Sequence, residues 1–304
     1  MDTPFHPGEL AIQERAGVRE QVADFGGRAI RSFMPDQHRA FFAQLPWLLV
    51  GSVDPDGHPQ ASVLWGSPGF AHSPEPERLR IDALAEADDP LYANLYDGAL
   101  LGLLGLELPT RRRNRLNGRV EALDSEGFSV RTLQSFGNCP KYIQSRLWQA
   151  QPRTPGPSLS GVGLDPRWVE LATRSDTLFI ASLHAGENGG VDISHRGGPP
   201  GFLRLGEDGL LRLPDYAGNN LFNTLGNLAL EPRCALLLID FDSGDLLHLQ
   251  ATARIHWPQD GAPAWAPGAQ RMLSLRPGAW RLRRARLPLG FSELQYSPFL
   301  PTTD

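Results

Sequence analysis

The sequence repeats its own pattern once, and this repeat limits the folds that the chain can adopt. Residues 36–53 (DQHRAFFAQLPWLLVGSV) are echoed by residues 165–183 (DPRWVELATRSDTLFIASL), and residues 59–70 (PQASVLWGSPGF) by residues 191–202 (VDISHRGGPPGF). The echo continues from residues 78–95 to 210–225 and from residues 103–123 to 236–257. Two similar halves in one chain are expected to pack as a pseudo-dimer, the covalent form of a symmetric homodimer.

Each half has the pattern of short antiparallel strands with a short helix among them. Apolar residues alternate in LLVGSV, LFIASL and LLHLQATARI, and D-G, G-G and S-G pairs mark turns. The 32 Gly and 27 Pro also favour many turns and short strands. Because five or six strands per half must remove their edges, we expect a mainly β fold of two tandem split or closed barrels with short helices. The predicted halves are residues 1–152 and 164–304, joined by a linker at residues 153–163.

Charge and composition exclude several classes of protein. The formal net charge of −5 argues against a general nucleic-acid or membrane-surface binder, so neither partner is expected. Two cysteines, Cys139 and Cys234, form neither a disulfide framework nor a zinc site by themselves. The N-terminus lacks an apolar signal segment, and no apolar run is long enough to cross a membrane, which predicts a cytoplasmic protein. We find no catalytic triad, paired carboxylates or metal-spaced His/Cys cluster, and expect no metal.

The stretch SHRGGPPGF lies at the end of a predicted strand. It is not a dinucleotide fingerprint, because a strand and not a helix follows it. It is not a phosphate loop of the Walker type, because G-K-[ST] is missing. The glycines and prolines indicate a turn, which both halves need. Ser194, His195 and Arg196 stand before it and offer donors for an anion or the polar edge of a ring. Their counterparts in the first half are taken as Leu64, Trp65 and Gly66, so this candidate site belongs to the second half.

A second donor-rich stretch, GNNLFNTLGN, precedes and enters a predicted short helix. Asn219 or Asn220 is a good candidate N-cap, and backbone N–H groups at such an end attract anions. Asn223, Thr224 and Asn227 add more neutral donors than capping requires. The first half has Asp88 and Asp89 in the corresponding place, and these carboxylates would repel a phosphate.

Two further motifs lie in the first half. In SFGNCPKYIQ, Asn138 is expected to cap a helix that begins near Pro140, while Asn138 and Lys141 also gather donors there. In RRRNRLNGRV, strand alternation would put Arg111, Arg113 and Arg115 on one face, which is either solvated or turned toward an anion or the other half. The counterpart of Arg113 is taken as His248.

The duplicated pattern, with a donor-rich strand end followed by a strand and a short helix, resembles the pyridoxamine 5′-phosphate oxidase-like family of FMN-binding split barrels. The ends HPGELAIQERAG and SFGNCPKYIQ resemble a longer, two-barrel branch of that family. The resemblance implies that a flavin lies between the barrels, with the second half supplying most of its site. An Arg-Lys pair common in the family is replaced by Asn219 and Asn220, which implies Arg196 as the main cationic partner of the phosphate.

The site residues implied by this resemblance come from both halves. Asn219, Asn220, Asn223 and Thr224 would assist Arg196, and Ser194 and His195 lie on the strand expected beside the ring. His248 falls where a family glutamine reaches the ring. The remaining first-half candidates are Trp65, Asn138 and Lys141.

The resemblance implies FMN as cofactor and a flavoprotein oxidoreductase that moves hydride or electrons between the flavin and a small molecule, NAD(P)H or oxygen. A vitamin B6 oxidase proper is not expected, because the Arg-Lys pair is replaced. Two alternatives stay open: a non-catalytic flavin carrier, and a haem-binding split barrel with His195 or His248 as axial ligand. FMN or FAD, one or two flavins per chain, the substrate, an electron-transfer partner and a homodimer of pseudo-dimers also stay open, and no catalytic residue is assigned.

Overall fold

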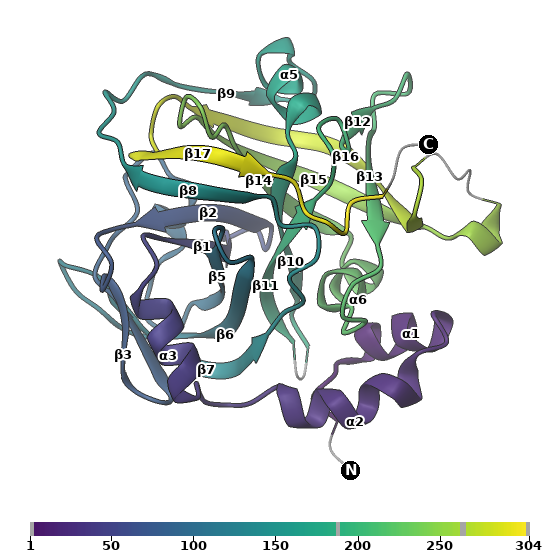
Figure 1. The fold of residues 1–304 in the computed structure, drawn as a ribbon, viewed down its shortest axis with the longest axis horizontal. Helices are drawn as coiled ribbons and strands as arrows, with labels where there is room; N and C mark the ends of the chain where they lie inside the picture. The colour runs from purple at the N-terminus through teal and green to yellow at the C-terminus, as the bar shows by residue number, and fades with distance from the viewer. Residues whose placement is uncertain (1–2, 187–188, 262–265, 302–304) are drawn as a thin grey trace.

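A computed structural model describes residues 3–186, 189–261 and 266–301 and shows a mainly β protein with short helices (Figure 1). The predicted fold class is therefore confirmed. The first sheet contains β1 (Trp47–Val53), β2 (Pro59–Trp65), β3 (Ala71–Glu75), β4 (Arg78–Ile81), β5 (Leu100–Glu107), β6 (Arg112–Leu123) and β7 (Phe128–Gly137). Their spatial order is β2-β1-β5-β6-β7-β4-β3, with antiparallel pairing throughout.

The second sheet has the same order of strands as the first. It contains β10 (Thr177–His184), β11 (Gly190–Gly197), β12 (Arg204–Leu205), β13 (Leu211–Tyr216), β14 (Arg233–Ile239), β15 (Leu246–His256) and β16 (Ala269–Arg283). The spatial order β11-β10-β14-β15-β16-β13-β12 is that of the first sheet strand for strand. β9 (Ser158–Val162) also pairs with β16, so the predicted linker at residues 153–163 contains a strand of the second sheet.

Strand register corrects two of the sequence correspondences. In the first sheet, Leu49 of β1 is opposite Val63. In the second sheet, the equivalent Phe179 of β10 is opposite His195. Ser194, His195 and Arg196 therefore correspond to residues 62–64 and not to residues 64–66. On the other side of the sheets, Leu104 of β5 is opposite Arg115 of β6, and the equivalent Leu237 of β14 is opposite His248 of β15. His248 is therefore the counterpart of Arg115 and not of Arg113. Both corrected pairs agree with the alignments of residues 59–70 with 191–202 and of residues 103–123 with 236–257 when these are followed position by position.

Short helices begin where the sequence supplies start signals. α4 (Pro90–Asn94) and α5 (Pro166–Arg174) each follow an Asp-Pro pair, in which the Asp carboxylate accepts a backbone N–H and the Pro occupies the first turn. α3 (Asp36–Ala43) packs beside β3, and α6 (Asn223–Leu230) lies next to β10. α1 (Pro7–Arg15) and α2 (Arg19–Ala29) cross beneath α6 at the lower right of Figure 1. A short 3₁₀ turn, η1 (Pro258–Asp260), follows β15.

A hydrophobic core joins the two sheets face to face. Each sheet has a cluster of buried apolar side chains of its own, and a third cluster combines Trp47, Leu49 and Leu104 of the first sheet with Phe179 and Leu237 of the second. β1, β2 and β5 accordingly contact β10, β11 and β14. A two-stranded sheet of β8 (Ser145–Ala150) and β17 (Leu289–Gln295) adds a further link above this interface in Figure 1. No helix in the described part of the chain is long and apolar enough to span a membrane.

Candidate functional site

A cavity of about 70 Å³ lies where β11, β13 and α6 of the second half meet β6 of the first. Eight of the predicted site residues line it: Asn138, Ser194, His195, Arg196, Asn219, Asn220, Asn223 and Thr224. Arg113, Arg115, Asp215 and Arg271 also line it, although the sequence prediction did not place them in the site. We call this space the anion cavity, for the charges described next.

Two arginines of the anion cavity have little compensating charge. Arg113 Nε donates to the backbone oxygen of Cys139 at 2.7 Å, and Arg113 Nη1 lies 3.3 Å from His195 Nδ1. Burial, together with the neighbouring Arg196, lowers the pKa of Arg113 to about 9. Arg196 has its nearest carboxylate oxygen, on Asp215, at 3.8 Å, and burial lowers its pKa as well.

The other two arginines are paired, and their carboxylates are shared. Arg115 Nη1 donates to Asp192 Oδ1 at 2.9 Å and also contacts Asn223, while Arg115 Nη2 donates to Ser194 Oγ. Arg271 Nε donates to Asp215 Oδ2 at 2.9 Å. Two carboxylates therefore face four arginines, which leaves this region with excess positive charge.

Several buried donors of the cavity have no hydrogen-bond partner within the described residues. They are Arg115 Nε, Arg196 Nε, Asn138 Nδ2 and His195 Nε2. An arginine can only donate, so His195 Nδ1 accepts from Arg113 and the imidazole proton sits on Nε2. Unpaired buried donors are costly unless a ligand satisfies them, so this donor set fits an anion such as a phosphate group.

A buried carboxyl group of the N-terminal helix lies behind the cavity. Glu9 Oε1 accepts from Asn223 Nδ2, and Glu9 Oε2 accepts from the backbone N–H of His6 at 3.0 Å. Burial, reinforced by the nearby Asp192 carboxylate, raises the pKa of Glu9 to about 8. Glu9 is therefore largely protonated at neutral pH and does not cancel the positive charge of the arginines.

The loop before α6 differs from the predicted capping arrangement. The N-cap position of α6 is Phe222, so neither Asn219 nor Asn220 occupies it. Asn219 instead accepts from the backbone N–H of Leu221 at 3.1 Å and donates to Asn138 Oδ1 at 3.1 Å. Asn220 and Phe222 both have a φ of 62°, a left-handed conformation that moves the helix start along the chain. The two asparagines still line the cavity.

The helix predicted after Asn138 is absent from the structure. Residues 138–144 follow an irregular path in which Tyr142 has a φ of 65°. Arg111, which turns away before β6 begins, donates to the backbone oxygen of Ile143 at 3.0 Å, while Arg113 holds that of Cys139. These contacts use carbonyl groups that a helix would have paired internally, and they come from Arg113 of β6 and from Arg111 just before it.

Three predicted site residues lie away from the anion cavity. Lys141 packs its ammonium group 5.7 Å from the centre of the Phe299 ring. Trp65 stands at the end of β2 in an apolar hollow with Trp148. His248 lies in the corresponding groove on the other side of the interface between the sheets. Arg113 and Arg115 could have replaced them in the prediction, because the alternation in RRRNR already put both side chains on one face.

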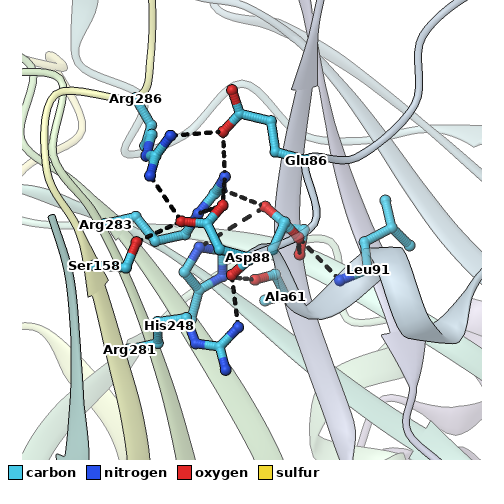
Figure 2. Close-up of polar contacts among 11 residues, drawn as sticks. Ala61, Glu86, Asp88, Leu91, Ser158, His248, Arg281, Arg283 and Arg286 are labelled. Atoms are coloured by element: carbon cyan, nitrogen blue, oxygen red, sulfur yellow. Dashed lines mark hydrogen bonds and ion pairs between the residues drawn. The ribbon is translucent and has the colours of Figure 1, made fainter. Parts of the chain in front are cut away.

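The corresponding groove contains a network of acidic and basic side chains. Figure 2 shows Arg283 reaching Asp88 and Glu86, with Arg286 beside them. The fully buried Arg283 guanidinium lies 2.6 Å from Asp89 Oδ2 and 2.7 Å from Asp88 Oδ1. Burial would raise the pKa of Asp88, but hydrogen bonds from Arg283 and Ser158 lower it to about 2. Carboxylates therefore stand here in place of the asparagines of the anion cavity.

The comparison with protein families identifies the first half of the chain. Residues 34–158 match the family model described as pyridoxamine 5′-phosphate oxidase. These residues form a domain of the pyridoxamine 5′-phosphate oxidase-like family. The match begins before α3 and ends at the first residue of β9, so it includes the whole first sheet of this family domain.

The solved structures that match part of the chain have low identity to it and low TM-scores. A candidate pyridoxamine 5′-phosphate oxidase from Lactobacillus delbrueckii has 16% identity and a TM-score of 0.28, covering 35% of this chain and 95% of its own. HupZ of Group A Streptococcus has 13% identity and a TM-score of 0.29, covering 37% and 93%. HutZ, a heme storage protein from Vibrio cholerae, has 16% identity and a TM-score of 0.22, covering 45% and 99%. No curated protein matches the chain.

Proposed function

We propose that the protein is an FMN-binding flavoprotein that holds the flavin phosphate in the anion cavity. The observation that carries this proposal is the set of unpartnered buried donors, Arg115 Nε, Arg196 Nε and Asn138 Nδ2. Four arginines and one carboxylate, Asp215, line the cavity, and a second carboxylate, Asp192, pairs with Arg115. Charge-assisted hydrogen bonds to a phosphate would satisfy these donors and offset the excess positive charge. The matched family supplies the expectation that the phosphate belongs to FMN.

The cavity is large enough for a phosphate group and too small for a whole flavin, since ligand pockets of that kind hold about 300 Å³ or more. Tyr216, which lines the cavity, packs its ring 5.1 Å from that of Tyr142. These half-buried rings supply apolar surface beside the cavity for the isoalloxazine. His195, whose Nε2 carries a proton, is the proposed donor to its polar edge.

We propose an oxidoreductase in which the bound flavin exchanges hydride or electrons with a small molecule, NAD(P)H or oxygen. The flavin supplies the redox chemistry, and the residues of this chain bind it, orient it and keep water from its phosphate. A flavin carrier would use the same cavity without turnover. Anaerobic mixing with NADH or NADPH, followed by oxygen, separates these two functions, because only the enzyme bleaches and recovers the flavin absorption.

The haem alternative does not fit the geometry at His195. An axial imidazole needs a lone pair that faces the iron, and at His195 the lone pair is on Nδ1, which accepts from Arg113. His248, whose Nδ1 lies 2.8 Å from the backbone oxygen of Ala61, keeps a lone pair on Nε2 and stays open as an axial ligand. The absorption spectrum of the purified protein is decisive here. Flavin bands near 375 and 450 nm, general to flavins, are expected, and a Soret band would contradict the proposal.

The phosphate site is tested with FMN and riboflavin, which differ by the phosphate group. Arg196→Ala should weaken FMN binding by about 10-fold to 100-fold, the usual effect of losing a charge-assisted hydrogen bond, and leave riboflavin binding nearly unchanged. Quenching of flavin fluorescence measures both affinities. Arg276→Ala, at an exposed arginine of β16, is the matched control. Equal affinity of the wild-type protein for FMN and riboflavin would rule out the phosphate assignment.

A further inference from the structure

A pocket of about 300 Å³ lies beside the start of β10 and the end of β14, outside both grooves described above. The last turn of α5 and parts of β8 and β17 complete its wall. None of its lining residues lines the anion cavity or the groove of His248. We call it the Arg146 pocket. Its volume lies at the lower end of the range for sites that bind small molecules.

Arg146 of β8 brings a buried donor to the wall of this pocket. Its side chain is 8% exposed, and its Nη2 donates to Asp176 Oδ2 at 2.6 Å. The guanidinium carbon lies 4.2 Å from the centre of the Phe241 ring. Arg146 Nη1 is buried and has no hydrogen-bond partner within residues 3–186, 189–261 and 266–301. Because arginine can only donate, this nitrogen fits an acceptor supplied by a ligand.

The other charges of the pocket disfavour a simple anion as that ligand. Its charged lining residues are Arg146, Arg174, Asp176, Asp240, Asp242 and Glu293. The carboxylates outnumber the guanidinium groups by four to two. Arg174 is already paired with Asp240. An acceptor group that arrives together with a positive charge is therefore favoured over a bare anion.

Asp176 provides a place for that positive charge next to Arg146. Its side chain is 7% exposed, its Oδ1 accepts from Thr177 Oγ1 at 2.8 Å, and its Oδ2 accepts from Arg146. Each carboxylate oxygen can accept a second hydrogen bond. Since Arg146 and Asp176 contact each other, an acceptor bound to the first and a cation bound to the second would be close neighbours. The carboxylate and ammonium groups of an α-amino acid, which share one carbon atom, have this arrangement.

The remaining wall of the Arg146 pocket is largely apolar. Phe241 and Phe291 meet edge to face, with ring centres 4.9 Å apart at 82°. Leu171 and Ile239 are buried and also line the pocket. This surface suits an apolar side chain, because its contact removes apolar area from water on both partners.

We propose that the Arg146 pocket binds a free α-amino acid with an apolar side chain. The ligand carboxylate accepts from Arg146 Nη1, its ammonium group donates to Asp176, and its side chain packs against the two phenylalanine rings. Asp242 and Glu293 repel molecules of net negative charge. This site is separate from the phosphate site of the proposed flavin and does not depend on it.

L-leucine and two analogues that each lack one charged group test the proposal. Isoamylamine is leucine without its carboxylate, and isocaproate is leucine without its ammonium group. Isothermal titration calorimetry of the full-length protein should show saturable binding of leucine with one site per chain. Each analogue should bind roughly tenfold more weakly or worse, since each loses a charge-assisted hydrogen bond. Absence of saturable leucine binding, or equal affinity for leucine and either analogue, would overturn the proposal.

Two variants locate the leucine site. Arg146→Lys keeps the positive charge beside Asp176 but removes the guanidinium fork, and should weaken leucine binding by roughly tenfold. Arg131→Lys, at an exposed arginine of β7, is its matched control and should not. Ser292→Trp, which fills the pocket from an exposed position of β17, should weaken binding at least roughly tenfold without disturbing the core, and Gln149→Trp on the neighbouring strand should not.

The remaining outcomes separate this pocket from the anion cavity. Leucine binding that Arg146→Lys and Ser292→Trp both leave unchanged would overturn the proposal. Loss of leucine binding in Arg196→Ala would place leucine at the anion cavity and also overturn it. Failure of FMN binding alone would leave the assignment of the Arg146 pocket untouched.

Discussion

At the scale of single residues, Asp192 organises the base of the anion cavity. Its buried carboxylate accepts from Arg115 at 2.9 Å, from Asn117 at 2.7 Å and from Asn227 at 3.3 Å. These donors come from β6 and α6, so one side chain joins both halves of the chain. Removal of its charge would leave Arg115 buried without a counterion.

Asp192→Asn should therefore lower the free energy of unfolding by about 3–5 kcal/mol, the usual cost of breaking a buried ion pair. Urea denaturation followed by circular dichroism measures this change. Asp242→Asn, at an exposed turn position, should stay within about 0.5 kcal/mol of wild type. A similar small effect at Asp192 would show that the carboxylate does not hold Arg115 in solution.

The ionisation of Glu9 makes the free energy of unfolding depend on pH. Its pKa is about 8 in the folded protein and near 4.5 in the unfolded chain, so the protonated form favours folding. The stabilisation that Glu9 contributes is fully present below pH 4.5, declines as the pH rises and is gone once the pH passes about 8. His6, whose pKa burial lowers to about 4, is neutral in the folded protein and mostly neutral in the unfolded chain above pH 7, so its contribution there is small.

Between pH 7 and pH 8.5, wild-type protein should lose roughly 1 kcal/mol more stability than Glu9→Gln, since a tenfold change in a protonation equilibrium corresponds to about 1.4 kcal/mol. Urea midpoints of the two proteins at both pH values provide the measurement. Equal pH profiles would mean that Glu9 is ionised in the folded state at pH 7.

At the scale of elements, the sequence predicted strands and turns better than the segments around the cavity. The strands β1, β10 and β15 lie where apolar runs predicted strands, although β1 and β10 are buried on both faces and only the end of β15 alternates between buried and exposed residues. α4 and α5 begin at Asp-Pro starts. The segment after Asn138 and the start of α6 depend on contacts from distant elements, such as that of Arg113 with Cys139. No local pattern predicts those contacts, so capping rules applied to Asn138 and Asn219 gave wrong expectations.

The docking of α1 on α6 depends on a close approach between two glycines. A Cβ on Gly8 would lie 2.1 Å from the backbone oxygen of Gly226. Gly8→Ala should therefore separate the helices, expose Glu9 and speed proteolysis or hydrogen exchange in α1 by roughly tenfold or more. Gly27→Ala in α2, where a Cβ meets nothing within 4 Å, is the matched control and should be neutral or slightly stabilising. Unchanged protection of α1 in Gly8→Ala would contradict this packing.

At the scale of the whole molecule, the shared core should make both sheets unfold together. Trp47 and Phe179 meet edge to face across the interface, with ring centres 6.2 Å apart at 89°. We expect one unfolding transition for tryptophan fluorescence and circular dichroism. A double-mutant cycle of Trp47→Leu and Phe179→Leu should give a coupling energy of about 0.5–1.5 kcal/mol. Two separate transitions would show that the halves are independent domains.

The matching strand order of the two sheets has a consequence for how sites can change. In a symmetric homodimer every substitution appears in both grooves, so a gain in one is repeated in the other. Here Arg196 has Leu64 as its counterpart, and Arg115 has His248. One groove is rich in positive charge, whereas the other pairs its arginines with carboxylates and contains His248. Joining two halves in one chain lets each groove be altered alone.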